Sequence, residues 1–137
     1  MKILDVLIVE DEPSNREIAE VILTNLGHRV VSCDSGQAAL DICLKEGRRF
    51  DLVLMDVLTP VLDGLKATRE LRAHDETKEM AIICVSAKAS GSDEAAGLQA
   101  GCDAYLRKPY RRKDLLSCIN EVLARRGILA PGERLGE

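Results

Sequence analysis

Five short runs of apolar residues alternate along the chain with longer stretches in which apolar residues recur at helical spacing. The runs are rich in Val and Ile and are bounded by turn-forming residues, which is typical of β-strands. We expect strands over residues 5–9, 29–33, 52–55, 81–85 and 104–107. Strands that alternate with helices predict an α/β domain with a parallel sheet. The first, third and fourth runs are almost wholly apolar, so they should form the centre of that sheet, where helices cover both faces.

A helix is predicted in each gap between strands and after the last strand, giving five helices. Pro13 suits the first turn of the first helix, which should end at Gly27. The fourth helix is rich in Ala and Gly and is therefore the weakest of the five. The predicted helices begin near Pro13, Ser35, Asp63, Ser92 and Leu115.

The length of 137 residues corresponds to a single domain. We assign it to residues 1–126, because the helical periodicity stops near Arg126. Four residues that interrupt periodicity follow: Gly127, Pro131, Gly132 and Gly136. Residues 127–137 are therefore expected to form a flexible C-terminal tail.

Charge and composition exclude several classes of partner. The formal net charge is −4, whereas nucleic-acid and membrane-surface binders need clustered excess Lys and Arg. The basic residues near Arg111 are interpreted as the solvated start of a helix, and His28 and His74 as exposed residues. The five cysteines are odd in number and lack metal-ligand spacing, which favours small core residues in a reducing compartment. No apolar run approaches the ~18 residues of a membrane span, so we expect a cytoplasmic location.

Polar residues follow four of the predicted strands. Glu10 and Asp11 follow the first, Asp56 the third, Ser86 the fourth and Lys108 the fifth. The carboxyl ends of parallel strands share one edge, and ligands bind at that edge where the strand order reverses. With the strand order 2-1-3-4-5, the three acids should lie on both sides of that crevice.

This combination supports phosphoryl transfer to a carboxylate. Oxygen ligands from Asp11 and Asp56 suit Mg²⁺, and Glu10 is expected to act through a bound water. Asp56 is the candidate nucleophile, because a cation would offset the repulsion between its carboxylate and a phosphoryl group. Lys108 and Ser86 could hold phosphoryl oxygens that the metal does not bind.

These motifs resemble those of the response-regulator receiver domains of two-component signalling, over roughly residues 3–125. The matching segments are Ile8 to Pro13, Leu54 to Asp56 with Thr59-Pro60 and Asp63-Gly64, Val85 to Ala87, and Gly101 to Pro109. The resemblance implies a flavodoxin-like (CheY-like), doubly wound, five-stranded sheet. It also implies that Asp56 is phosphorylated and that Glu10, Asp11, Asp56 and the backbone carbonyl of Leu58 hold Mg²⁺.

By the same resemblance, Ser86 and Tyr105 form a switch pair, and the bond between Lys108 and Pro109 is cis. The phosphoryl donor would be a histidine kinase or a histidine phosphotransfer protein. The downstream protein target would contact the fourth helix, fifth strand and fifth helix, with the chain monomeric or dimerising on phosphorylation. Such a domain is a phosphoacceptor switch and not an enzyme, apart from self-phosphorylation by small donors and self-dephosphorylation.

Three alternatives remain at this point. A phosphatase or phosphotransferase with an Asp nucleophile would use the same acyl phosphate, but it generally needs a second acid beside the nucleophile and a cap, and Asp56-Val57-Leu58 offers no such acid. A flavodoxin-like cofactor carrier would need a loop rich in Ser, Thr and Gly where Glu10 to Glu12 stand. The chain could also be a receiver segment excised from a hybrid histidine kinase, although its start and tail favour a single-domain regulator.

Overall fold

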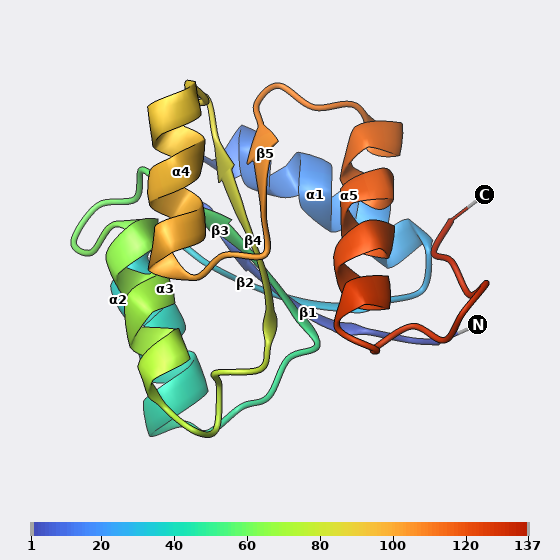
Figure 1. Cartoon of the computed structure of the whole chain (residues 1–137), viewed down its shortest axis with the longest axis horizontal. Coiled ribbons are helices and arrows are strands. Elements are labelled where there is room, and N and C mark those ends of the chain that lie inside the picture. Colours follow the sequence, from blue (N-terminus) through green and yellow to red (C-terminus); the bar gives the residue numbers. More distant parts are fainter. Residues whose placement is uncertain (1, 137) are drawn as a thin grey trace.

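The computed structural model describes residues 2–136, and its five strands form one parallel sheet in the order β2-β1-β3-β4-β5 (Figure 1). This confirms the predicted fold class and strand order. The central strands β1, β3 and β4 are the ones whose sequences are almost wholly apolar. The strands are β1 (Asp5–Val9), β2 (Arg29–Cys33), β3 (Leu52–Asp56), β4 (Ala81–Ser86) and β5 (Ala104–Arg107).

Four of the α-helices begin after residues whose side chains accept hydrogen bonds from free backbone N–H groups. The carboxylate of Glu12 accepts hydrogen bonds from the N–H groups of Ser14 and Asn15, and Asp63 accepts one from the N–H of Lys66. The second helix changes from α-helical to π-helical winding halfway along. The helices are α1 (Pro13–Asn25), α2 (Gly36–Leu40) with the π-helix η1 (Asp41–Lys45), α3 (Gly64–Ala73), α4 (Gly91–Ala100) and α5 (Arg112–Arg125).

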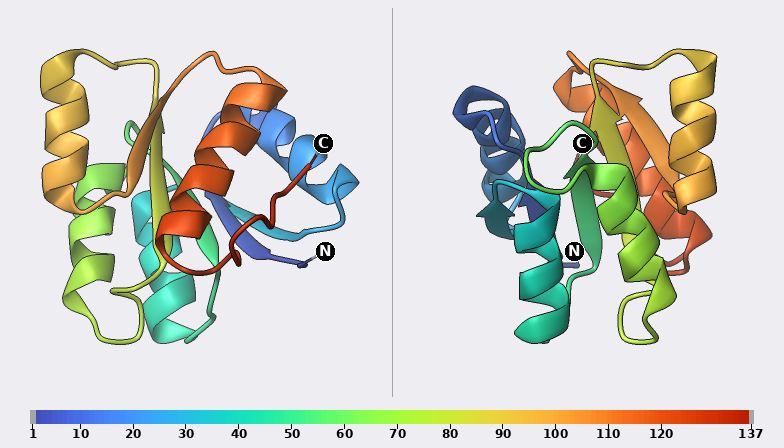
Figure 2. Two further views of the ribbon diagram at one scale, coloured as in Figure 1. Left: turned by 45° about the vertical axis from the view of Figure 1, so that its right-hand side comes forward. Right: turned by 90° about the vertical axis from the view of Figure 1, so that its left-hand side faces the viewer.

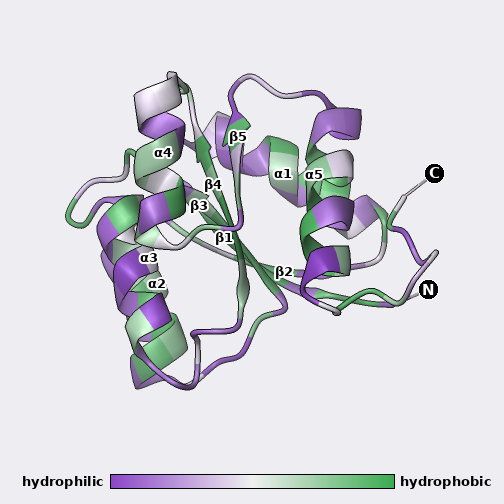
Figure 3. Cartoon of the chain, viewed as in Figure 1, coloured by the Kyte–Doolittle hydropathy of each residue, from purple (hydrophilic) through white to green (hydrophobic). Residues whose placement is uncertain are grey.

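Helices cover both faces of the sheet and give the molecule two apolar cores. α1 and α5 lie on one face, and α2, α3 and α4 lie on the other (Figures 1 and 2). Alternate residues of each central strand enter opposite cores: Leu52 and Leu54 pack with α1 and α5, whereas Val53 and Met55 pack with α2 and α3. Apolar residues therefore lie mainly along the strands and on the inner sides of the helices (Figure 3). Among residues 2–136, no helix has the length and apolar content needed to cross a bilayer.

His28 is buried, so the prediction that it is exposed is wrong, whereas His74 is exposed as expected. The His28 residue is 4% exposed, and its Nδ1 accepts a hydrogen bond of 3.0 Å from the N–H of Leu4. Its Nε2 has no hydrogen-bond partner among the residues that the structure describes. The ring supplies the acceptor that the backbone needs just before β1, and its burial lowers the pKa of His28.

We expect stability to fall below about pH 6.5, the ordinary pKa of His, partly because of His28. The unfolded chain binds a proton there, whereas the folded chain resists it. The stabilisation is therefore full above that pH and is lost as the pH falls towards the lowered pKa of the folded state. This effect can lower the free energy of unfolding by at most about 1.4 kcal/mol for each pH unit. Urea unfolding of the parent protein and of His28→Gln from pH 7.5 to 5.5 measures this, and identical pH slopes would contradict it.

The segment after α5 differs from the flexible tail expected from its composition. Leu129 is 3% and Leu135 0% exposed, and both belong to the core formed by α1 and α5. The side chain of Asn120 on α5 accepts a hydrogen bond from the N–H of Leu135 (2.6 Å) and donates one to its carbonyl (3.1 Å). In the described residues 127–136 the segment therefore packs back along the domain, near the N-terminal end of β1 (Figure 1). Residue 137 lies outside the described range.

We expect Asn120→Ala to release this segment. The substitution leaves the buried N–H and C=O of Leu135 without partners and should cost about 2 kcal/mol. Amide hydrogen exchange at Leu135 and limited proteolysis between Gly127 and Leu135 would show the release. Ser117→Ala is the matched control, because Ser117 is exposed on the same helix. Equal protection of Leu135 in both variants would contradict the expectation.

Candidate functional site

The polar residues singled out in the sequence meet at the carboxyl edge of the sheet. Glu10 directly follows β1, Asp56 ends β3, and Ser86 ends β4. Asp56 pairs in register with Val85, the residue before Ser86. Lys108 follows β5, and its ammonium group contacts Glu10 and Asp56. Parallel pairing in a continuous register therefore brings together side chains that are far apart in sequence.

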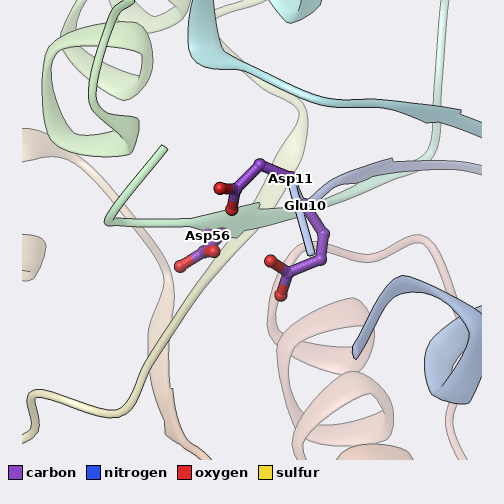
Figure 4. Close-up of side chains that lie close together, drawn as sticks. All are labelled: Glu10, Asp11 and Asp56. Atoms are coloured by element: carbon purple, nitrogen blue, oxygen red, sulfur yellow. The ribbon is translucent and has the colours of Figure 1, made fainter. Parts of the chain in front are cut away.

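Three carboxylates form a cluster at this edge. Glu10, Asp11 and Asp56 each offer one oxygen, and these oxygens lie within 4.8 Å of one another (Figure 4). Glu10 and Asp56 are each 5% exposed, whereas Asp11 is exposed. Oxygen donors at this spacing, with one member open to solvent, are the ligand set that a hard divalent cation such as Mg²⁺ prefers.

Lys108 partly compensates the negative charge of the cluster. Its Nζ donates hydrogen bonds to Glu10 (2.5 Å) and to Asp56 (3.3 Å). Burial is the main cause of the raised pKa of Glu10, and neighbouring Asp56 adds to it. Burial by itself would lower the pKa of Lys108, but the contacts with Glu10 and Asp56 raise it overall. The cluster has three carboxyl groups and one neighbouring ammonium group, and the resulting excess of negative charge favours a cation.

The carboxylate of Asp56 is held at both oxygens. Oδ1 accepts a hydrogen bond of 3.2 Å from the N–H of Leu58, and Oδ2 faces Lys108. Leu58 itself is 52% exposed, in the loop between β3 and α3. A buried carboxylate that is fixed in orientation and lies at the end of a strand is well placed to act as a nucleophile towards a group that enters from this edge.

The two predicted switch residues both interact with the loop that follows β4. Ser86 is 1% exposed, and its Oγ accepts a hydrogen bond of 3.0 Å from the N–H of Lys88. The hydroxyl of Tyr105 on β5 donates a hydrogen bond of 2.6 Å to the carbonyl of Lys88. The peptide bond between Lys108 and Pro109 is cis, as predicted.

Gly64 has a role at this site that the sequence interpretation missed. From the sequence, Gly64 is only part of a family motif next to the predicted helix start at Asp63. A Cβ atom at Gly64 would lie 2.2 Å from the carbonyl oxygen of Asp56 and 2.9 Å from the Cγ of Met55. The first turn of α3 therefore packs directly on the backbone that carries Asp56. The glycine itself could have indicated this close contact, because Asp63 alone is enough to start the helix and does not require a glycine after it.

Comparison with known proteins agrees with this geometry. Residues 6–120 match the model of the family described as "Response regulator receiver domain". The chain belongs to the response regulator receiver domain family. The match runs from Val6 in β1 to Asn120 in α5, and so includes every residue of the acid cluster and Lys108.

Relatives of the receiver domain include short and long proteins. The chain is 35% identical to protein PilH of Pseudomonas aeruginosa over 119 residues, which are 87% of this chain and 97% of PilH. It is 38% identical over 120 residues to the probable transcriptional regulator ycf27 of Porphyra purpurea, which covers 88% of this chain but only 47% of that protein. The chain thus spans about half the length of the ycf27 relatives.

A solved structure shows the same fold with a metal ion bound. The receiver domain of sensor histidine kinase PA1611 from Pseudomonas aeruginosa has a TM-score of 0.81 and 37% sequence identity, covering 90% of this chain and 99% of that one. Its crystal structure has a magnesium ion coordinated in the active site cleft. Receiver domains are phosphoacceptor modules of two-component signalling, and this chain has their fold and family sequence.

Proposed function

We propose that Asp56 accepts a phosphoryl group from a phosphohistidine donor and that the resulting acyl phosphate changes the conformation of this receiver domain. The observation that carries the proposal is the position of the Asp56 carboxylate. It is buried at the end of β3, fixed by the N–H of Leu58, and faces both Lys108 and two further carboxylates.

The transfer forms one bond and breaks one. An oxygen of Asp56 attacks the phosphorus atom, the bond between phosphorus and the donor's imidazole nitrogen breaks, and the imidazole takes up a proton. The ammonium group of Lys108 then donates hydrogen bonds to phosphoryl oxygens, which carry the charge that the transfer brings into the site.

Mg²⁺ is the proposed cofactor, held by Asp11, Asp56 and the backbone carbonyl of Leu58, with Glu10 acting through water. When bound, the ion would offset the repulsion between the carboxylates and an incoming phosphoryl group. The all-oxygen donor set and the excess negative charge of the cluster support this choice.

Ser86 and Tyr105 are the proposed switch residues. In the described structure both are hydrogen-bonded to the backbone of Lys88, so a movement of the loop after β4 changes both contacts. A phosphoryl group on Asp56 that attracts the Ser86 hydroxyl favours one arrangement of this loop. The face formed by α4, β5 and α5 would then change its affinity for a downstream protein, or for a second phosphorylated copy of the chain.

A histidine kinase or histidine phosphotransfer protein is the proposed donor, and the cytoplasm is the proposed location of the reaction. Four large apolar side chains on α1 and in the loop between β3 and α3 are exposed and could contact such a protein: Ile18, Val21, Leu58 and Val61. Each domain would accept one phosphoryl group from one donor molecule. The chain would therefore act as a switch and not as an enzyme that turns over a substrate. Its relatives include both a protein matched over 97% of its length and the receiver domain of a sensor histidine kinase.

The proposal is tested with acetyl phosphate as a small donor. We expect the intact mass of the protein to rise by one phosphoryl group in the presence of Mg²⁺ and to stay unchanged when EDTA removes the metal. Hydroxylamine should reverse the gain, because it cleaves acyl phosphates. A gain that is independent of the metal, or steady release of phosphate from a stable phosphate monoester, would contradict the proposed function.

A further inference from the structure

An apolar cavity lies directly beside the acid cluster, between α1 and the segment that joins β5 to α5. Its volume is about 290 Å³. The inner wall is formed by Ile8, Leu54 and Val85, which are at most 6% exposed. The exposed lining residues are Ile18, Ala87 and Pro109, and Ile18 is 49% exposed. The cavity, called here the α1 cavity, therefore opens to solvent next to Asp56.

The composition of the chain explains why no side chain fills this space. The protein has one Phe, two Tyr and no Trp, and no Phe contributes to the core on this side of the sheet. Ala19, one of the α1 residues that line the cavity, contributes only a methyl group. A void of this size, lined by aliphatic side chains, forfeits packing contacts that an apolar ligand would restore.

The size and the charges of the α1 cavity define the ligand. Benzene binds in an aliphatic cavity of about 150 Å³, so 290 Å³ admits a larger ring system. Glu10, Asp56 and Lys108 form one end, with two carboxylates for one ammonium group, and this excess of negative charge disfavours anions. The aliphatic wall disfavours a charged ring of either sign, which leaves a neutral ring system. Asn15 and Tyr110 add polar groups to the lining, and burial with neighbouring Glu10 raises the pKa of Tyr110 to about 12, so its phenol stays neutral.

We propose that the α1 cavity is a binding site for a small neutral aromatic compound that carries one hydrogen-bond donor. The ring occupies the space between Ile8, Leu54 and Val85, and the donor faces the polar end at Glu10. The cavity shares Glu10, Asp56 and Lys108 with the phosphorylation site, but binding in it is a separate activity, because it needs neither a metal ion nor a phosphoryl donor. A ligand held there would lie beside Asp56 and would cover it from the side of Ile18.

Indole is the probe of choice, because it is neutral, bicyclic and has a single N–H. Titration into the ¹⁵N-labelled protein, without Mg²⁺ or acetyl phosphate, should give saturable shifts of the amides around Ile8, Leu54 and Tyr110. A dissociation constant of about 1 mM is expected from the affinity that so few atoms can supply. Indole-3-acetate should bind at least tenfold more weakly, because its carboxylate would face Glu10 and Asp56.

Two matched variants locate the site. Ile18→Trp should close the mouth and weaken indole binding at least tenfold, whereas Val21→Trp should leave binding unchanged. Val21 is 47% exposed on the same helix but does not line the cavity, so both substitutions place Trp at half-exposed positions. The proposal is overturned if shifts do not saturate, if both variants bind indole equally, or if the anion binds as tightly as indole. None of these readouts depends on phosphorylation, so they are independent of the proposed function.

Discussion

Replacing Asp56 by Asn is expected to abolish the mass gain with acetyl phosphate completely. The amide has nearly the same shape as the carboxylate, so the N–H of Leu58 can still be satisfied and the fold should persist. The amide oxygen is a far weaker nucleophile, and the cluster keeps two carboxylates for a metal ion in place of three. Loss of one negative charge from crowded carboxylates also relieves repulsion, so the thermal midpoint should stay the same or rise.

The matched control for this substitution is Asp63→Asn. Asp63 lies in the same loop, but its carboxylate accepts a hydrogen bond from the N–H of Lys66 at the start of α3 and is not part of the acid cluster. Asn caps helices about as well as Asp, so this variant should fold and be labelled like the parent protein. Equal labelling of Asp56→Asn and the parent protein would reject Asp56 as the phosphoacceptor.

The sheet could be predicted because its information is local. The runs that become β1, β3 and β4 are apolar throughout, and this is the sequence pattern of a strand that is buried on both faces. Pro13 and Asp63 likewise mark helix starts through their own backbone and side-chain chemistry. The strand ends then determine where Asp56 and the acids that follow β1 lie. Ligands of parallel sheets bind at the carboxyl ends of the strands, and this rule can be applied without knowledge of side-chain packing.

The packing of the last segment could not be predicted, because it depends on a surface that exists only after folding. Leu129 and Leu135 are separated by Gly and Pro residues and show no periodicity, so their sequence is typical of a loop. They become buried because α1 and α5 leave an apolar surface between them, and Asn120 satisfies the backbone of Leu135 there. His28 was misjudged for the same reason, since its partner is the backbone N–H of Leu4, 24 residues earlier.

At the candidate site, residue types could be predicted but contacts could not. Lys108 was expected near the acids, yet its ion pair with Glu10 joins residues 98 positions apart. Its position between Glu10 and Asp56 depends on how β5 and the following segment approach β1 and β3. The close contact of Gly64 with Asp56 likewise depends on the path of the loop between β3 and α3, which no local pattern describes.

Gly64→Ala is therefore expected to damage both the fold and the site. The new methyl group would meet the carbonyl oxygen of Asp56 at 2.2 Å and its carbon at 2.9 Å, and these are backbone atoms that cannot rotate away. Separation of α3 from β3 should cost about 3 kcal/mol, the upper part of the range for overpacking. A displacement of Asp56 by about 1 Å could slow phosphorylation about 100-fold. Urea unfolding and the initial rate of labelling by acetyl phosphate measure the two effects.

Gly91→Ala provides the comparison that isolates this contact. Gly91 is the first residue of α4, as Gly64 is the first residue of α3, but a Cβ atom at Gly91 would meet no atom within 4 Å. Alanine favours the helix, so Gly91→Ala should be as stable as the parent protein or up to about 1 kcal/mol more stable, with normal labelling. If Gly64→Ala matched it in both stability and labelling rate, then α3 would not constrain Asp56, and the position of the carboxylate would have to depend on β3 and Lys108 alone.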